Sequence, residues 1–287
     1  MLCAFCWEIP EPEAGGLRRG RFIGTFLRMK NPSNKQLLDV CVDAARTAGE
    51  HALKNLHRRE EIAQHFDHDV KLVMDSECQR IAEGVIHNHF PDHAILGEEG
   101  STIRDHAFEW IIDPIDGTVN YTHGLPGWCC SIAVRRDSEI LAGCVFVPLV
   151  NECYAATVDG PALCNGAPIQ PSAAPTLGKA ILFTGLTKDI DARAITFLGD
   201  AARTMHKLRI QGSAAIDVCN VACGRADGYF EPGLYLWDIA AAGLIAERAG
   251  AVCTAYPRGE EHGLRFLCTN PQIHHAAREL VEKHFKD

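Results

Sequence analysis

The sequence predicts a layered fold of α-helices and β-strands, with an α+β half followed by an α/β half. In the first half, two helical patterns accompany short apolar runs and a strand meander, whereas the second half alternates strand-like and helix-like segments. Apolar residues make up 47% of the 287 residues, which is enough to bury a large core. We place the halves at residues 31–175 and 176–287, with a ligand cleft between them, where such clefts commonly lie.

Two helices are predicted in the first half from capping patterns. Ser33-Asn34-Lys35-Gln36 has the form of a capping box, and apolar residues follow it at helical spacing to about Leu56. Ser76-Glu77-Cys78-Gln79 offers a similar start for a second helix, with Asp75 at its beginning.

Strands are predicted from short apolar or alternating runs, and Asn165-Gly166 indicates a tight turn near the end of the first series. The strand-like segments are residues 94–96, 109–112, 129–135, 140–148, 152–157, 180–184, 206–210, 227–231, Val252 and 265–269. Further helices are expected near residues 190–204, 213–224 and 238–249, and a last one from Pro271, whose missing N–H is harmless in a first helical turn.

Charge and hydropathy exclude two classes of protein. The formal net charge of −9 argues against general affinity for nucleic acid or an anionic membrane. No stretch approaches the roughly 20 apolar residues that cross a bilayer.

Residues 1–30 show no helical or strand period and are interpreted as a flexible extension, so Met29 is a candidate start of the protein. The arginines near residue 19 are not followed by the apolar core of an export signal. We therefore expect a cytoplasmic protein.

The 13 cysteines are scattered through strand-like and helix-like segments. Cys3-Ala4-Phe5-Cys6 has no partner pair at the spacing of a zinc ribbon. We interpret the cysteines as reduced thiols of the core, because free cysteine is among the most buried residue types.

Three acidic clusters carry the functional prediction. Gly97-Glu98-Glu99 follows one apolar run, Asp113-Pro114-Ile115-Asp116-Gly117-Thr118 follows another, and Trp237-Asp238 opens a helical segment. Magnesium takes hard oxygen ligands and needs only a few rigid carboxylates. Pro114 restricts Asp113 to extended geometry, so the turn presents two acids and the Ile115 carbonyl. Each cluster alone is a common surface or turn pattern, and only their combination predicts a metal site.

The residues after the second cluster suggest how a phosphate is held. Gly117-Thr118 opens a helical segment, whose first amides and threonine hydroxyl suit an anion. Two cations about 3.5 to 4 Å apart activate a water and stabilise a leaving oxygen. These acids therefore predict hydrolysis of a phosphate ester.

From Ser33 to the C-terminus, the chain resembles the inositol monophosphatase family of the lithium-sensitive, magnesium-dependent phosphatase superfamily. The resemblance rests on Gly97-Glu98-Glu99, on Trp110-Ile111-Ile112-Asp113-Pro114-Ile115-Asp116-Gly117-Thr118-Val119-Asn120-Tyr121, and on Tyr235-Leu236-Trp237-Asp238-Ile239-Ala240-Ala241-Ala242-Gly243. It implies a layered αβαβα sandwich of the sugar phosphatase type, and a homodimer.

The resemblance also implies roles for individual residues. Glu98, Asp113 and the Ile115 carbonyl would bind a first magnesium, and Asp113, Asp116 and Asp238 a second. A third, weaker magnesium would share Glu98, giving two to three ions per site. Asp75 would orient Thr118 or a metal-bound water, and Glu98 and Thr118 would position the nucleophilic water. The backbone amides of Gly117 and Thr118 would bind the phosphate. Ser213 and Glu231 would contact the substrate.

The substrate is the least determined part of the prediction. We expect a small polyol phosphate, foremost inositol monophosphate, with histidinol phosphate, fructose 1,6-bisphosphate or another sugar phosphate as alternatives. Lys71 departs from the Leu-Val-Thr-like run of many relatives, and is either a surface charge or a contact for a second anionic group. Gly212 before Ser213 is equally compatible with a plain turn, and Glu231 with a solvated acid. A catalytically silent metal-binding protein is the alternative of a different class.

Overall fold

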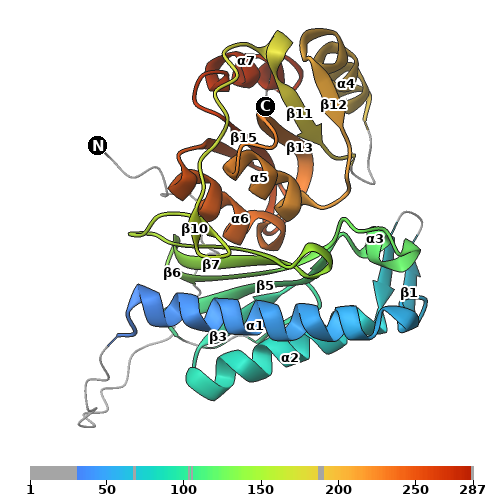
Figure 1. The fold of residues 1–287 in the computed structure, drawn as a ribbon. Coiled ribbons are helices and arrows are strands. Elements are labelled where there is room, and N and C mark those ends of the chain that lie inside the picture. The colour runs from blue at the N-terminus through green and yellow to red at the C-terminus, as the bar shows by residue number, and fades with distance from the viewer. Residues whose placement is uncertain (1–30, 67–68, 103, 105, 187–190, 286–287) are drawn as a thin grey trace, which may run out of the picture.

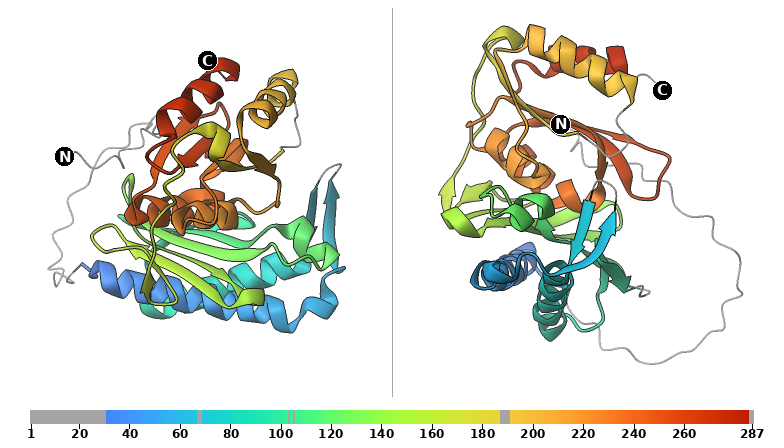
Figure 2. Two further views of the ribbon diagram at one scale, coloured as in Figure 1. Left: turned by 45° about the horizontal axis from the view of Figure 1, so that its top comes forward. Right: turned by 90° about the vertical axis from the view of Figure 1, so that its right-hand side faces the viewer.

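The fold is a stack of five layers, seen in a computed structural model that describes residues 31–66, 69–102, 104, 106–186 and 191–285 (Figure 1). The predicted N-terminal extension, Cys3 and Cys6 lie outside these ranges. Helices, a large sheet, helices, a small sheet and helices follow one another from bottom to top (Figures 1 and 2). The predicted αβαβα sandwich is confirmed.

The large sheet has eight strands in the order β10-β9-β8-β7-β6-β5-β3-β4, and only β3 and β5 pair in parallel. Two helices, α1 and α2, cover one face with a shared apolar core (Figure 1). The elements are α1 Asn34–Lys54, α2 Val73–His89, β3 Ala94–Gly97, β4 Gly100–Thr102, β5 Phe108–Asp116, β6 Cys129–Arg136, β7 Glu139–Val147, β8 Glu152–Thr157, β9 Leu163–Cys164 and β10 Ala167–Pro168.

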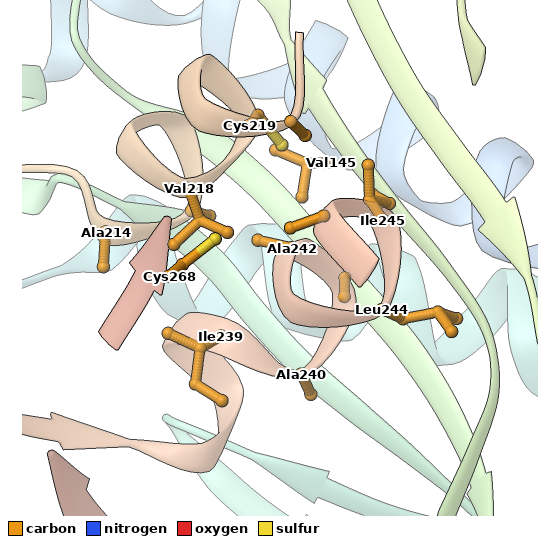
Figure 3. Packing of buried hydrophobic residues seen from close by; sticks show 14 of the residues in the cluster. Val145, Ala214, Val218, Cys219, Ile239, Ala240, Ala242, Leu244, Ile245 and Cys268 are labelled. Carbon is orange, nitrogen blue, oxygen red and sulfur yellow. The ribbon is translucent and has the colours of Figure 1, made fainter. Parts of the chain in front are cut away.

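The small sheet has five strands in the order β12-β11-β13-β15-β14. Helices α5 and α6 lie between the two sheets (Figures 1 and 3), and α4 and α7 cover the outer face of the small sheet (Figure 1). The elements are β11 Ile181–Thr184, α4 Ala192–Thr204, β12 Lys207–Arg209, α5 Ala214–Ala222, β13 Gly228–Tyr235, α6 Leu236–Ala249, β14 Val252–Pro257, β15 Gly263–Thr269 and α7 His274–His284.

Short elements complete the chain. They are the 3-10 turns η1 Leu56–Arg58, η2 Pro148–Val150 and η3 Leu177–Lys179, the paired strands β1 Ile62–Phe66 and β2 Asp69–Leu72, and the helix α3 Thr118–His123. The β1–β2 hairpin was not predicted, because its strands are only five and four residues long and β1 mixes apolar and polar residues without a regular period. None of the helices in the described ranges is both long and apolar enough to span a bilayer.

Several helix boundaries test the predictions from capping patterns. The Ser33 box is confirmed, because the Gln36 amide donates to Ser33 Oγ and the Ser33 amide to Gln36 Oε1, at 3.3 and 2.9 Å. The predicted start of the second helix at Ser76 is wrong, since α2 already begins at Val73. The last helix also does not begin at Pro271, because a turn precedes α7.

Small side chains allow α6 to pack closely on the large sheet. Ala240, Ala241 and Ala242 are buried, and Figure 3 shows Ala240 and Ala242 on α6 within the core between the sheets. A Cβ atom on Gly143 of β7 would lie 2.8 Å from the Ala241 Cα. This close approach fixes the first turn of α6, which carries Asp238, against the strands that carry the other acids.

Candidate active site

The acids of the second cluster lie at the carboxyl end of β5, where its pairing with β6 is interrupted. Asp113 pairs with Ser131 and Asp116 with Cys129, so β5 has one extra residue between these pairs. Pro114 lies at this bulge, since proline has no amide to donate to a neighbouring strand. The bulge turns the end of the strand and presents both acids.

Glu98 reaches the same place because β3 runs parallel to β5. Gly97 pairs with Ile112, and the Glu98 amide donates to the Ile112 carbonyl at 3.1 Å. The carboxyl ends of parallel neighbours lie at one edge of a sheet. The structure therefore places Glu98 one strand away from Asp113.

Asp75 and Asp238 occupy the same position in two different helices. Each is the third residue of its helix and accepts a backbone amide that precedes the helix, Leu72 N to Asp75 Oδ2 at 2.8 Å and Tyr235 N to Asp238 Oδ2 at 2.7 Å. An acid in the first turn is stabilised by the free amides there. These two acids thus begin α2 and α6, and Ser76 is not the cap of α2.

The carboxyl groups raise one another's pKa. Asp113 is 1% exposed, and its Oδ1 has no hydrogen-bond partner among the described residues. Burial raises the pKa of Asp113 well above its usual value, and the charges of Glu98, Asp116, Asp238 and Asp75 add to this effect in that order. Asp113 is therefore the acid whose pKa is raised by all four of the other predicted acids.

Asp116 has a different environment, because the other half of the molecule supplies its donors. Ser213 Oγ donates to Asp116 Oδ2 at 2.6 Å, Ala215 N donates to the same oxygen at 2.7 Å, and Ala214 N to Oδ1 at 3.2 Å. Burial raises the pKa of Asp116, while these three hydrogen bonds oppose the rise. In this structure the buried Ser213 hydroxyl is directed at Asp116, and its predicted substrate contact remains a prediction.

Gly117 and Thr118 form a tight turn between β5 and α3. Gly117 has φ 92°, and a Cβ there would lie 2.6 Å from the Gly127 carbonyl oxygen, so glycine is required for both reasons. Thr118 Oγ1 donates to the Ile115 carbonyl at 3.0 Å. A carbonyl oxygen has two lone pairs, so this bond leaves one acceptor site on Ile115.

Asn120 is a residue of this site to which the sequence assigned no role. Its Nδ2 lies 2.6 Å from the Gly127 oxygen, 2.7 Å from the Gln211 oxygen and 3.4 Å from the Gly212 oxygen. It therefore fastens α3 to the turn that supplies Asp116 with donors. Asn120 belongs to the motif after β5, but two of its three partner carbonyls are 91 and 92 residues away and leave no local signal.

Glu231 lies on β13, just before the strand's pairing with β15 shifts register. Tyr229 Oη donates to Glu231 Oε2 at 2.6 Å, and the carboxyl fills the space beside Gly185 that a side chain would need. Burial raises the pKa of Glu231 to about 7, partly offset by Tyr229. Its partial burial argues against the simple solvated acid that the sequence allowed.

The chemistry of these residues fits a divalent cation. As the side chains stand within the described part of the chain, no three His, Cys, Asp or Glu residues form a group that would hold a metal. Asp75, Asp116 and Asp238 instead accept hydrogen bonds from amides or a hydroxyl. The donors are nevertheless the hard oxygens that magnesium takes, and a cation beside the unpartnered Asp113 Oδ1 would offset the crowded negative charge.

Comparisons with known proteins agree with this architecture. The model of the inositol monophosphatase family matches residues 33–286. The chain is 36% identical to Nus factor SuhB of Vibrio cholerae over 233 residues, 79% of this chain and 87% of the relative. It is 33% identical to inositol monophosphatase of Dictyostelium discoideum over 272 residues, 89% and 98% of the two chains.

Solved structures show the same fold. An inositol monophosphatase of Thermotoga maritima aligns with a TM-score of 0.78 and 30% identity, over 86% of this chain and 96% of the other. The extragenic suppressor protein suhB of Bartonella henselae aligns with a TM-score of 0.81 and 26% identity, over 87% and 100%. The chain therefore belongs to the inositol monophosphatase family, whose members are metal-dependent phosphatases.

Proposed function

We propose that this phosphatase is a magnesium-dependent phosphomonoesterase that acts on a small polyol phosphate, foremost inositol monophosphate. The observation that carries the proposal is the crowding of four other carboxyl groups around Asp113, which is buried and has an unpartnered oxygen. Such crowding costs free energy unless a cation compensates it. A phosphate ester then supplies further oxygens to the same cations.

The proposed ligands follow the positions of the acids. Glu98, Asp113 and the Ile115 carbonyl would hold a first magnesium, and Asp113, Asp116 and Asp238 a second; a third ion would share Glu98. When bound, these ions would neutralise the carboxylates, polarise the phosphate and lower the pKa of a water. Support comes from the mutual effects on pKa, in which Asp113 is affected by every other acid of the set.

The chain's own groups would position the reactants. The Thr118 hydroxyl is oriented by its bond to Ile115 O, and Glu98 is held beside Asp113 by the β3–β5 pairing. We propose that Thr118 and Glu98 orient the attacking water and that Asp75 orients Thr118 or that water. The amides of Gly117 and Thr118 would bind the phosphate oxygens, with Gly117 held in its turn by close packing on Gly127.

We propose that Glu231 and Ser213, which belong to the small-sheet half, select the substrate. Glu231 would accept a hydroxyl of the polyol, which suits a carboxylate oriented by Tyr229. Ser213 would contact substrate only if its hydroxyl released Asp116. The side chain of Lys71 lies outside the described residues, so its proposed contact with a second anionic group rests on the sequence alone.

Release of inorganic phosphate from a panel of esters tests the proposal. The panel contains inositol 1-phosphate, histidinol phosphate, fructose 1,6-bisphosphate and glycerol 2-phosphate, each with magnesium and with EDTA. Magnesium-dependent turnover, highest on inositol 1-phosphate, is expected. A preference for another ester would reassign the substrate within the family, whereas no turnover of any ester would favour the catalytically silent alternative.

The remaining expectations concern assembly and location. We propose a cytoplasmic homodimer that binds neither nucleic acid nor membranes, on the basis of the family resemblance and the net charge of −9. Some relatives carry the name Nus factor, so direct binding to RNA is the point to test. A sedimentation measurement with and without RNA checks both the dimer and this absence of binding.

A further inference from the structure

Two buried thiols outside the acidic site lie in contact on neighbouring strands. Cys144 on β7 and Cys153 on β8 have their Sγ atoms 3.5 Å apart. The register pairs Cys144 with Ala155 and Phe146 with Cys153, so the two cysteines are diagonal neighbours on one face of the sheet. Both belong to the core under α1 and α2, on the face opposite α6.

The surroundings of the two thiols are unequal. Arg46 of α1 lies over the Phe146 ring at 4.7 Å and donates to Asn151 Oδ1 at 3.4 Å, which places its charge at the start of β8. The Cys144 thiol, followed by the charge of Arg46, holds the pKa of Cys153 below its usual value against the effect of burial. The pKa of Cys144 is raised, first by Cys153 and then by burial.

Most other described thiols lack this combination, and at Cys164, which has both Cys223 and Arg225 nearby, burial outweighs the arginine and the pKa is raised. Burial raises the pKa of Cys41, Cys78, Cys130 and Cys219, and no arginine lowers the pKa of any of these four thiols. Cys253 and Cys268 are directly opposite on β14 and β15, yet the pKa of Cys253 is raised, first by Cys268 and then by burial. This second pair is therefore a comparison within the same chain, with two adjacent thiols and a raised pKa at Cys253.

We propose that Cys144 and Cys153 are a dithiol oxidation site, which hydrogen peroxide converts to an intramolecular disulfide. The Cys153 thiolate attacks one peroxide oxygen, giving a sulfenic acid and hydroxide, which takes up a proton to become water. The Cys144 thiolate, after losing its proton, attacks the Cys153 sulfur and displaces the hydroxyl group as a second water. In total, two thiols and one peroxide give one disulfide and two waters.

Access and geometry suit a small oxidant. Cys153 is 6% exposed and Cys144 is fully buried, so peroxide reaches Cys153 first and the disulfide forms inside the core. The sulfurs must approach from 3.5 Å to about 2.05 Å, a shift that side-chain rotation on neighbouring strands can provide.

The test is a mass-spectrometric map of the full chain after mild oxidation. Reduced protein is treated with hydrogen peroxide at neutral pH, free thiols are alkylated, and the chain is cut with Glu-C protease and trypsin. Cleavage after Glu152 separates the two cysteines, so their disulfide joins peptide 140–152 to peptide 153–179 with Cys164 alkylated. We expect this linked pair before any Cys253–Cys268 link, and its loss on treatment with dithiothreitol.

Variants assign the order of events. In C144S, Cys153 should accumulate as a sulfenic acid that dimedone traps, whereas in C153S the Cys144 thiol should stay unmodified. R46Q should slow oxidation about tenfold for each unit by which the thiol pKa rises, while R46K keeps the charge and most of the rate. A first link between other cysteines, equal rates in R46Q and R46K, or no link in the wild-type protein overturns the proposal.

Discussion

The two halves of the molecule contribute differently to the acidic site. The large-sheet half supplies Asp75, Glu98, Asp113 and Asp116, whereas the small-sheet half adds Asp238 and neutral donors. Ser213, Ala214 and Ala215 direct a hydroxyl and two amides at Asp116 across the interface. The large-sheet half thus carries most of the negative charge, and the small-sheet half stabilises part of it with hydrogen-bond donors. Asp113 receives no such donors at Oδ1, and we propose that it is the acid that depends most on a cation.

The largest expected effect separates Asp113 from Asp116. Asp113→Asn should lower phosphatase activity roughly a thousandfold, because it removes the proposed bridging charge. The same change should raise the melting temperature in EDTA, since it removes a buried charge with an unpartnered oxygen. Asp116→Asn should instead lower that temperature, because its three donors lose a charged acceptor. Full activity of Asp113→Asn would contradict the two-metal assignment.

The second prediction measures the bond from Ser213 to Asp116. Ser213 caps α5 and also donates to Asp116, whereas Ser33 only caps α1. Loss of an N-cap costs about 1 kcal/mol, and a hydrogen bond to a buried charge about 1.5 to 3 kcal/mol. Urea unfolding should therefore show that Ser213→Ala is more destabilising than Ser33→Ala by about 2 kcal/mol. Equal losses would show that the contact between the halves adds little.

The third prediction concerns the hydrogen bonds from Asn120 to the Gly127 and Gln211 carbonyls. Asn120→Asp replaces a donor to several carbonyls by an acceptor, so it should destabilise the fold by about 1 to 2 kcal/mol and lower kcat more than it raises KM. Asn55→Asp is the matched control, because Asn55 Nδ2 donates to the His51 carbonyl within a single helix end. If Asn120→Asp lowers stability but leaves kcat unchanged, these hydrogen bonds have no role in catalysis.

The smallest expected effect is a change in pH dependence. Burial raises the pKa of Asp217 to about 8, while Gln211 opposes the rise and Asp116 and Glu231 add to it. The folded state therefore keeps a proton that the unfolded chain loses above about pH 4. The free energy of unfolding should fall as pH rises from about 4 to 8, and Asp217→Asn should remove about 1 kcal/mol or more of that fall. Urea unfolding in EDTA at pH 5 and 8 measures this, and an unchanged difference between the two pH values would contradict it.

Local signals in the sequence were reliable where the structure depends on near neighbours. The Ser33 capping box, the Asn165-Gly166 turn and the acids after apolar runs follow from residues a few positions apart. The start of α2 was misjudged because Asp75, and not Ser76, is the acceptor for an amide before the helix. The β1–β2 hairpin was missed because strands of five and four residues are too short to give a clear hydrophobic period.

The sequence by itself determined the family and the position of the acids directly after apolar runs, because these depend on residue chemistry and on short spacings. The tertiary structure decided which donors reach Asp116, which carbonyls Asn120 joins and which thiols touch. Ser213 and Asp116 are 97 residues apart in the chain, and Asn120 and Gln211 are 91 apart. Such contacts form only when two sheets pack on the helices between them, and no local pattern encodes that approach.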